Sequence, residues 1–432
     1  VGGRVAVTTA AGREIRACRI LLATGLTDVL PDLPGVRENW GDRVIHCPWC
    51  HGWEVRDQRI AVIDTAGAGA HQATLFTRLS DDVTLVCDRE VDLDAVSRER
   101  LGLVGVKVHE RAATSIDAIG DGMRVTFTDG ATLEVDAVVV GPRFAANAAP
   151  VDHLVTVGEH ASGMGTHVVV DEMGSTTHPA IYAAGNVADP MQQVVHAAAN
   201  GSRVAMSIAA DLMEDDIDRA RRSVAETEEW DGRYREHEGE MWSGQPNGSL
   251  VVELADARPG TALDLGCGEG ADAIWLASLG WDVTGTDISN IAVDRARDAA
   301  AKQGVAVTFA ASDVITEPLP AATYDLIAIS YPALKRDPGI AAMPNIVGAL
   351  TPGGRLVVIG HTEMDMAVAA EHGFDPGQYL SIDDMIDAVG RLGGGDDGGE
   401  AFTIETDEVR DRPNPPPNSH HSRDRILTIR RR

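Results

Sequence analysis

A glycine-rich turn between two apolar strands constrains this chain more than any other stretch. Residues 261–270 read TALDLGCGEG, in which an apolar strand runs into the turn. A helical stretch at 271–279 follows, and a second strand at 281–286 ends on Asp287. Glycines let a ligand approach the backbone where a Cβ would collide, and an acid at the tip of the next strand can accept hydrogen bonds from a ribose diol. The stretch therefore predicts a βαβ unit with a nucleotide-binding crevice.

Length and composition narrow the class of protein. The chain has 432 residues, of which 44% are hydrophobic, and this length predicts about three domains. The net charge of −29 argues against a nucleic-acid partner, whose phosphates need Lys and Arg, and suits a small-molecule substrate. No apolar run approaches the ~20 residues of a membrane helix, and no signal pattern is visible. The five cysteines are too few and too unevenly spaced for a secreted disulfide scaffold. We therefore expect a cytoplasmic protein without a membrane partner.

Further strands follow the glycine turn in the order of a doubly wound α/β domain. With helices expected between them, the later strands are 305–310, 323–330, 354–359 and a final antiparallel pair at 402–406 and 425–429. The motif, its spacing and the strand order resemble class I S-adenosylmethionine (SAM)-dependent methyltransferases over roughly residues 230–432. The resemblance implies a Rossmann-like α/β fold with a seven-stranded sheet whose last strand is antiparallel.

The same resemblance implies a role for individual residues. Gly266 and Gly268 would line the methionine part of the cofactor, and Asp287 would hold the ribose hydroxyls. Asp313 would hydrogen-bond the adenine amino group, with Val314 near the base. The cofactor-binding residues expected in this way are Asp264, Gly266, Cys267, Gly268, Asp287, Ile288, Asp313, Val314 and Ser330.

A dinucleotide dehydrogenase is the main alternative for such a crevice, and an α/β domain without a ligand is the other. A dehydrogenase uses spaced glycines to bring a pyrophosphate onto a helix N-terminus. The carboxylate of Glu269 in this turn would repel a pyrophosphate, whereas it suits the α-amino group of SAM. The turn therefore favours the methyl donor.

An aromatic segment before the first strand narrows the resemblance. Residues 230–234 read WDGRY and residues 241–247 read MWSGQPN, while the chain ends in HHSRDRILTIRRR. Together these look like the tellurite-resistance and thiopurine type of small-molecule methyltransferase. The aromatic segment would then cap the active site; packing as an ordinary helix is the alternative.

The end of the fourth strand bears on the methyl acceptor. Residues 330–333 read SYPA and depart from the Asn/Asp-Pro-Pro-Tyr pattern of many nucleic-acid and glutamine N-methyltransferases. A thiol or other soft nucleophile fits better, because a free thiol with a pKa near ~8.5 needs little base catalysis. His361, just after the fifth strand, is a candidate for deprotonation, although such a histidine is more often structural. We expect in-line methyl transfer governed by proximity and alignment.

A Cys-x-x-Cys pair is the second chemical motif. Cys47 and Cys50 enclose Pro and Trp, and such a pair can form a redox-active disulfide at a helix N-terminus, which lowers a thiol pKa. Half of a zinc site is the alternative, since His46 and His51 flank the pair. Zinc, however, would need a second pair at suitable spacing, and the other cysteines stand alone.

The surroundings of this pair resemble thioredoxin reductase-like flavin disulfide reductases over about residues 1–213. The likeness rests on residues 20–25 (ILLATG), 46–54 (HCPWCHGWE) and 181–187 (IYAAGNV). Dithiol oxidases of this family share the Cys-x-x-Cys-His-Gly pattern and dispense with NADPH. The resemblance implies a homodimer through this half and FAD held by Thr24, Gly25, Gly185, Asn186 and Gln193.

Departures from the reductase pattern bear on both cofactors. The family's opening Gly-x-Gly-x-x-Gly is absent, so we expect a segment to precede Val1. Asp64 and Ala66 replace glycines of the NADPH turn, where a carboxylate opposes a pyrophosphate. Residues 87–89 (CDR) replace a basic cluster, and Asn186 replaces the aspartate that holds the ribityl chain. These departures argue against NADPH and weaken the expectation of FAD.

The sequence thus predicts a fusion. We expect a partial FAD-type domain at 1–42 and 149–213, an NAD(P)-type domain with the cysteine pair at 43–148, a charged linker at 214–240 and the methyltransferase at 241–432. The predicted activity is SAM-dependent methylation of a small molecule, joined to a dithiol/disulfide module. One alternative is that a flavin-dependent disulfide reductase or dithiol oxidase is the main activity. The other is that the N-terminal half is a non-catalytic dimerisation domain.

Overall fold

The computed structural model describes residues 5–65, 67–88, 93–362, 375–392, 401–413, 415 and 422–432. They form two compact units, and the boundary between Leu212 and Met213 lies inside one long helix. The loop predicted at 393–399, most of the proline-rich loop at 413–419, and the side chains of Ala66 and Arg89 lie outside the described residues.

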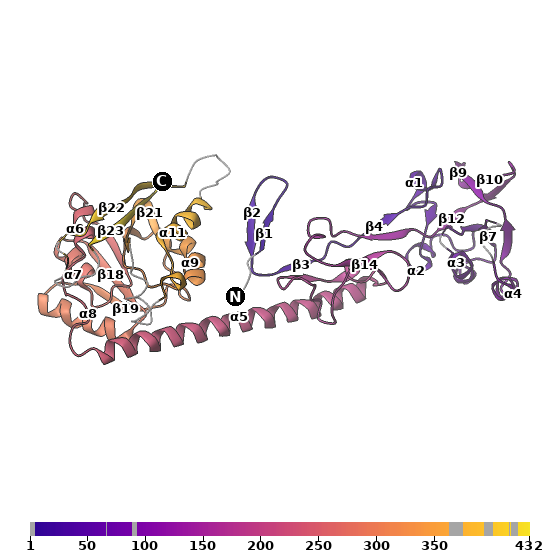
Figure 1. The fold of residues 1–432 in the computed structure, drawn as a ribbon. Helices are drawn as coiled ribbons and strands as arrows, with labels where there is room; N and C mark the ends of the chain where they lie inside the picture. The colour runs from indigo at the N-terminus through magenta and orange to yellow at the C-terminus, as the bar shows by residue number, and fades with distance from the viewer. Residues whose placement is uncertain are drawn as a thin grey trace. The chain divides into compact units, whose positions relative to one another are not determined.

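A five-stranded parallel sheet forms the centre of the N-terminal unit (Figure 1). Its strands, in spatial order, are β5 (Val44–Ile45), β12 (Ala137–Val140), β6 (Ile60–Ile63), β7 (Val83–Cys87) and β8 (Lys107–Glu110). Every residue of β6, β7 and β12 is buried, because the sheet is covered on both faces. The cover consists of the helices α3 (Gly69–Phe76) and α4 (Ala95–Leu103) on one face, and the antiparallel sheet of β11 (Thr132–Val135), β10 (Gly122–Phe127) and β9 (Ala113–Ile119) on the other. Strands β6 and β7, with α3 between them, form a βαβ unit.

The rest of this unit consists of small strand pairs. The parallel pair β3 (Ile20–Leu22) and β16 (Ile181–Ala183) forms a small core with its neighbours. The antiparallel pairs are β1 (Val5–Thr8) with β2 (Glu14–Ala17), β4 (Leu26–Val29) with β13 (Arg143–Ala146), and β14 (Val157–Glu159) with β15 (Thr166–Val168). Short helical turns are α1 (Val36–Asn39), α2 (Pro48–His51) and η1 (Gly185–Val187). Gly12, which has φ 81°, lies in the turn that joins β1 to β2.

One helix, α5 (Val194–Glu236), spans 43 residues. The sequence predicted a charged linker at 214–240, separate from the preceding domain. The structure has no break between them. Ion pairs one helical turn apart, such as Arg219–Asp216 and Arg233–Glu229, support the exposed second half.

A seven-stranded sheet forms the C-terminal unit. In spatial order its strands are β19 (Thr308–Ala311), β18 (Asp282–Asp287), β17 (Thr261–Leu265), β20 (Tyr324–Ser330), β21 (Leu350–His361), β23 (Arg423–Arg431) and β22 (Phe402–Asp411). Strand β23 runs antiparallel to both of its neighbours, as predicted for the last strand. The chain leaves β17 toward β18 on one side and later returns to β20 on the other. The carboxyl ends of β17 and β20 therefore lie side by side where the strand order reverses, which is where the sequence predicts the nucleotide-binding crevice.

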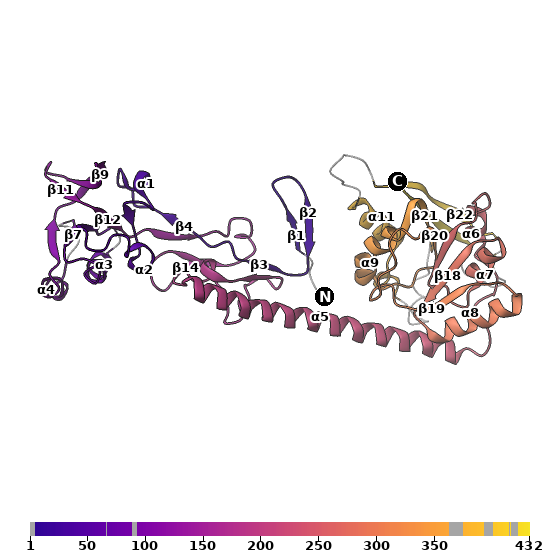
Figure 2. The same ribbon diagram turned by 180° about the vertical axis from the view of Figure 1, so that it is seen from behind.

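Helices cover both faces of this sheet (Figures 1 and 2). The helices α6 (Gly248–Glu253), α7 (Ala271–Ser278) and α8 (Asn290–Gln303) pack on one face, and α9 (Arg336–Gly348) and α11 (Ile382–Gly390) on the other, with η2 (Pro376–Gln378) before α11. The predicted α/β class with a doubly wound C-terminal sheet is confirmed.

Candidate cofactor site and redox pair

The glycine turn after β17 presents open backbone at the carboxyl edge of the sheet. Gly266 has φ +74°, and a Cβ built there would meet no atom within 4 Å. The amides of Gly266 and Cys267 both donate to the carbonyl oxygen of Thr286, at 2.8 and 2.9 Å, which ties the turn to β18. A ligand can therefore approach the backbone at Gly266 without meeting a side chain.

Asp287 ends β18 beside this turn. Its Oδ2 accepts a hydrogen bond from the amide of Gly268 at 2.9 Å, and its Oδ1 accepts one from the amide of Ser289 at 2.9 Å. Each carboxylate oxygen keeps a further lone pair for another donor. Burial raises the pKa of Asp287. Ile288, which follows it, is half-buried. The geometry suits an acid that accepts from a diol.

Two buried acids lie behind the turn. Asp264 is the fourth residue of β17, and its Oδ2 accepts from the amide of Ala273 at 3.0 Å. Asp272, in the first turn of α7, accepts from the amide of Asn247 and from the hydroxyl of Ser330, each at 2.6 Å. Burial raises the pKa of both acids, and the charge of Asp272 raises that of Asp264 further. This wall of the crevice favours a cationic ligand.

The last turns of α5 cover the glycine turn. Tyr234 is buried, and its hydroxyl accepts from Nε1 of Trp242 at 2.9 Å. A Cβ at Gly268 would lie 3.2 Å from that hydroxyl and 3.3 Å from that nitrogen. Asp231 accepts from the hydroxyl of Ser289 at 2.6 Å, at the start of α8. The aromatic segment therefore lies over the turn, where a cap was expected.

Glu269 connects the covering segment to the turn. Its Oε1 accepts from the amide of Met241 at 3.0 Å and from Arg295 at 2.9 Å, and its Oε2 accepts from the amide of Trp242 at 3.0 Å. The carboxylate thus fastens the covering segment to the turn. Its expected contact with the α-amino group of SAM stays a prediction.

The expected adenine end of the crevice lies beyond β19. Asp313 is buried and accepts from the amide of Ile315 at 2.9 Å, and Val314 is buried beside it. Burial and the charge of Asp313 raise the pKa of Glu226 on α5. Sequence reasoning missed Glu226. The available signal was its spacing, since Glu226, Trp230 and Tyr234 recur every fourth residue and share one helix face.

A network of polar side chains lies where β20 and β21 end. Tyr331 has φ 56°, a strained conformation for a residue with a side chain. Its hydroxyl donates to Oδ1 of Asp424 at 3.0 Å, and its ring stacks on His361 with 4.3 Å between centroids. Asp424 is fully buried and also accepts from the hydroxyl of Ser249 at 2.7 Å. Arg412 lies 5.2 Å from the Tyr331 ring. This network stands beside Ser330, at the expected acceptor position.

The cysteine pair of the N-terminal unit lies at the start of α2. Cys47 is the N-cap residue and Cys50 lies inside the helix, and both are free thiols. A hydrogen bond with Cys47, followed by burial, raises the pKa of Cys50 to about 11. A thiol with this pKa stays protonated at neutral pH. Trp49 and Trp53 beside the pair are 73% and 68% exposed.

Comparisons with known proteins match the two units to two families. Residues 2–201 match the pyridine nucleotide-disulphide oxidoreductase family, and residues 262–354 match a methyltransferase domain. The chain is a fusion of a thioredoxin reductase-like module and a methyltransferase domain. The fusion of these two families, which the sequence predicted, is confirmed.

Individual relatives cover parts of the chain. A probable thioredoxin reductase of Arthroderma benhamiae is 29% identical over 152 residues, which are 30% of this chain and 38% of that protein. The chain thus spans less than half the length of that relative. The crystal structure of HlmI shares 33% identity with a TM-score of 0.47 and covers 52% of this chain and 69% of that one. Magnesium protoporphyrin IX methyltransferase from Synechocystis PCC 6803, with bound SAH, shares 23% identity with a TM-score of 0.33 and covers 43% of this chain and 80% of that one.

In the reductase-like module, the structure brings the two expected flavin motifs together. Thr24 and Gly25 follow β3, and Gly185 and Asn186 follow the adjacent parallel strand β16. The Nδ2 of Asn186 donates to the carbonyl oxygen of Gln192 at 2.7 Å, a bond that an aspartate there could not donate. The residue that follows, Gln193, is exposed. Asn186 is thus held by its own loop.

The turn after β6 in this module is closed by its own acid. Oδ1 of Asp64 accepts from the amide of Gly67 at 2.7 Å. A Cβ at Gly69 would lie 2.5 Å from the Cβ of Asp64, so the side chain packs against the start of α3. The amide of Gly67 is a donor that a phosphate would otherwise need.

The described residues also bear on two other kinds of site. No three His, Cys, Asp or Glu side chains come together there as metal ligands. In the same part of the chain, no helix combines the length and apolarity needed to cross a bilayer.

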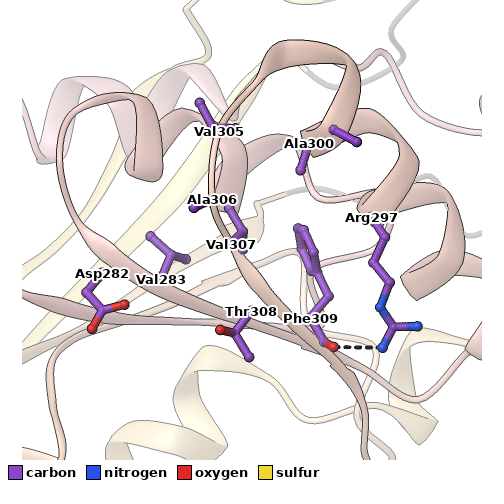
Figure 3. Close-up of a pocket in the computed structure, with 10 residues that line it drawn as sticks. Asp282, Val283, Arg297, Ala300, Val305, Ala306, Val307, Thr308 and Phe309 are labelled. Atoms are coloured by element: carbon purple, nitrogen blue, oxygen red, sulfur yellow. Dashed lines mark hydrogen bonds between the residues drawn. The ribbon is translucent and has the colours of Figure 1, made fainter.

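A pocket of about 330 Å³ lies apart from the crevice of the methyltransferase domain (Figure 3). Its lining includes Asp282 and Val283 at the beginning of β18, together with Arg297, whose guanidinium donates to the carbonyl oxygen of Phe309 at 2.8 Å. Ligands of open α/β sheets bind at the carboxyl ends of the strands. This pocket is at the other end of β18 and is not the cofactor crevice.

Proposed function

We propose that the chain transfers a methyl group from SAM to a small-molecule thiol or a related soft nucleophile. One observation carries the proposal. The open glycine turn is flanked by Asp264, Asp272 and Asp287, whose pKa values are all raised by burial. The nearby cation Arg295 is engaged by Glu269. A ligand that brings positive charge and a ribose diol fits this combination better than a pyrophosphate does.

The described residues divide the cofactor among them. Asp287 would accept from the ribose hydroxyls, and the backbone at Gly266 would face the methionine part. Asp313 and Val314 would hold the adenine, and Tyr234 would close the crevice from α5. When bound, SAM supplies a methyl group on a sulfonium sulfur. The chain contributes binding, exclusion of water and in-line alignment of the acceptor.

The acceptor would lie between Ser330 and the Tyr331–His361 stack. The ring of Tyr331 is fixed by its hydrogen bond to Asp424, so His361 is held at a defined place at the end of β21. A thiol suits this position, because the thiolate is a strong nucleophile and forms near neutral pH. The tellurite-resistance and thiopurine type of methyltransferase is the subclass we infer, from the segment that covers the turn.

Calorimetric titration with S-adenosylhomocysteine tests the cofactor assignment. We expect micromolar binding to the full chain and at least tenfold weaker binding to Asp287→Ala. Asp298→Asn, an exposed acid on α8, is the matched control and should bind like the parent. Binding would justify a screen of thiol acceptors by transfer of a labelled methyl group. Absence of binding to the full chain would refute the proposal.

We infer a second activity for the reductase-like module from its cysteine pair. The observation is that Cys47 and Cys50 lie within one turn at the start of α2 as free thiols, and that the raised pKa of Cys50 keeps this sulfur protonated near neutral pH. In thiol–disulfide exchange, Cys47 would attack a substrate disulfide and release one substrate thiol. Cys50 would then displace the second, so that the protein dithiol is oxidised as the substrate is reduced. A dithiol formed in this way is a methyl acceptor for the other domain.

A single-turnover assay tests this activity. The pair in the reduced chain should release two thiols per protein from an aromatic disulfide as it is oxidised, whereas in Cys47→Ser the lone Cys50 should release one and remain as a mixed disulfide. Cys18→Ser, which removes an exposed cysteine outside the pair, is the control. Equal release by Cys47→Ser and the parent would reject the activity.

The cofactors and partners that we propose for this module follow from the positions at which it differs from the reductase pattern. We assign no NADPH to it, because Asp64 closes the turn that a pyrophosphate would need. FAD remains the flavin to test, with absorbance near 450 nm as the readout. We also propose a cytoplasmic protein that forms a homodimer through this module. A net charge of −29 speaks against nucleic acid as a partner.

A further inference from the structure

The acids behind the glycine turn form a connected cluster. Asp272 receives two hydrogen bonds of 2.6 Å, one from the amide of Asn247 and one from the hydroxyl of Ser330. Asp264 and Asp272 interact electrostatically, and the charge of Asp287 acts on Asp264 as well. Asp264 is 2% exposed and Asp272 is 8% exposed, so water can solvate neither carboxylate well. Two neighbouring carboxylates in such a place cannot both ionise readily.

The groups around the pair supply little compensating charge. They are Cys267 in the turn, Asp287 on β18, Asp231 and Tyr234 on α5, the Glu269–Arg295 ion pair, and Tyr331 with Asp424 beyond Asn247. Most of these are acids or neutral groups. The cations beside these groups are Arg295, which Glu269 already neutralises, and Arg412, which lies 5.2 Å from the Tyr331 ring. A proton is therefore the counter-charge that the ligand-free cluster retains.

Ser330 connects this cluster to the acceptor position. It ends β20, and its hydroxyl donates to Oδ2 of Asp272. A hydroxyl can pass on a proton, because it donates one hydrogen bond and accepts others. The next residue, Tyr331, belongs to the network expected to face the acceptor. One hydroxyl thus separates Asp272 from the place where a thiol would lose its proton.

We propose that the Asp264–Asp272 pair releases a proton when the cationic methyl donor binds, and takes one up through Ser330 when the sulfonium charge disappears. The inference rests on the proposed function and adds a proton cycle to it. Asp272 and Ser330 then serve as the proton acceptor that His361 was considered for. The pair would therefore hold fewer protons with the methyl donor bound than with the demethylated product bound.

The step balances in atoms and charge. The acceptor sulfur forms a bond to the methyl carbon as the bond between that carbon and the donor sulfur breaks, and the bonding pair stays on the donor sulfur as a thioether. The thiol proton passes to the hydroxyl of Ser330, whose own proton moves to Asp272. The site loses one positive charge with the sulfonium and regains one with the proton.

Proton counting by calorimetry tests the first half of the cycle. SAM and S-adenosylhomocysteine are titrated into the full chain in buffers of different ionisation enthalpy at the same pH. We expect SAM to release more protons than its uncharged product, by up to about one, with affinity for SAM rising up to about tenfold per pH unit in that range. Binding of both ligands with equal proton release would overturn the inference and leave the proposed function standing. Binding of neither would instead reject the proposed function.

Variants test the assignment to these residues. In Asp272→Asn and in Asp264→Asn the amide oxygen can still accept from the backbone amide, so each keeps a hydrogen bond. Either variant should bind both ligands but lose the difference in released protons, and Asp298→Asn should retain it. A difference that persists in both pair variants would overturn the inference.

Ser330→Ala tests the second half. It should keep the proton difference between the two ligands, while kcat for a thiol acceptor falls and becomes more dependent on pH, because the thiol must ionise without the relay. Ser330→Thr, which keeps the hydroxyl, should restore the parent profile. An unchanged pH profile in Ser330→Ala would overturn the relay.

Discussion

Replacing Glu269 by glutamine should loosen the covering segment from the glycine turn. The amides of Met241 and Trp242 and the guanidinium of Arg295 all donate to this one carboxylate. A glutamine side chain has one acceptor oxygen and one NH2 group. Its NH2 would face a donor, so at least one backbone amide loses its partner, and Arg295 loses its counter-charge.

The size of the effect follows from the burial of the group. The carboxylate is 8% exposed, and a buried donor left without a partner costs about 1–3 kcal/mol. The charge-assisted bond to Arg295 adds a smaller amount, since that guanidinium is 28% exposed and water compensates part of the loss. We expect a destabilisation of about 2–4 kcal/mol. For a unit of this size, that corresponds to a decrease in Tm of about 5–15 °C.

Differential scanning calorimetry of the full chain measures this change. The transition of the methyltransferase domain is identified as the one that S-adenosylhomocysteine raises. Glu228→Gln, an exposed position on α5, is the matched control for the loss of one charge. A shift in Glu269→Gln no larger than the shift in the control would refute the role of this carboxylate.

Further substitutions probe the crevice, the acceptor network and acid stability. Gly266→Ala should cost only about 1 kcal/mol of stability, because nothing lies near the new methyl group and the strain comes from its positive φ. It should weaken S-adenosylhomocysteine binding in calorimetry by about tenfold or more, and unchanged binding would mean that the open side does not face the cofactor. Tyr331→Phe removes a donor from the buried Asp424 and should destabilise the domain by about 1–3 kcal/mol in urea unfolding; a neutral result would show that Asp424 has found another partner. The bond from Arg336 lowers the pKa of Asp384, so this carboxylate stabilises the fold above the ordinary carboxyl pKa and loses that contribution as pH falls through its lowered value. Asp384→Asn should therefore destabilise the domain at neutral pH, with the difference vanishing in strong acid, and a constant difference at all pH values would contradict this account.

Local patterns predicted the parallel strands of the chain well. Strand β17 has the predicted bounds, because a run of apolar residues that ends in glycine has few other solutions. The antiparallel last strand also followed from the order of motifs. The sequence predicted a separate linker at 214–240. In the structure, α5 runs without a break from Val194 to Glu236. Charged residues at helical spacing continue a helix in the same way as apolar ones, and their density suggested a boundary that the backbone does not have.

The sequence by itself determined the two chemical motifs of this protein, the glycine turn with Asp287 and the pair Cys47 and Cys50. Each is local, since the turn and the redox pair need only a few consecutive residues and a particular backbone conformation. The tertiary structure alone decided what surrounds them. It places Tyr234 over the turn, directs Glu269 to the covering segment and joins Tyr331 to Asp424 across 93 residues of sequence. Such partners are set by which faces meet when the sheet and helices pack, and no short-range pattern encodes that meeting.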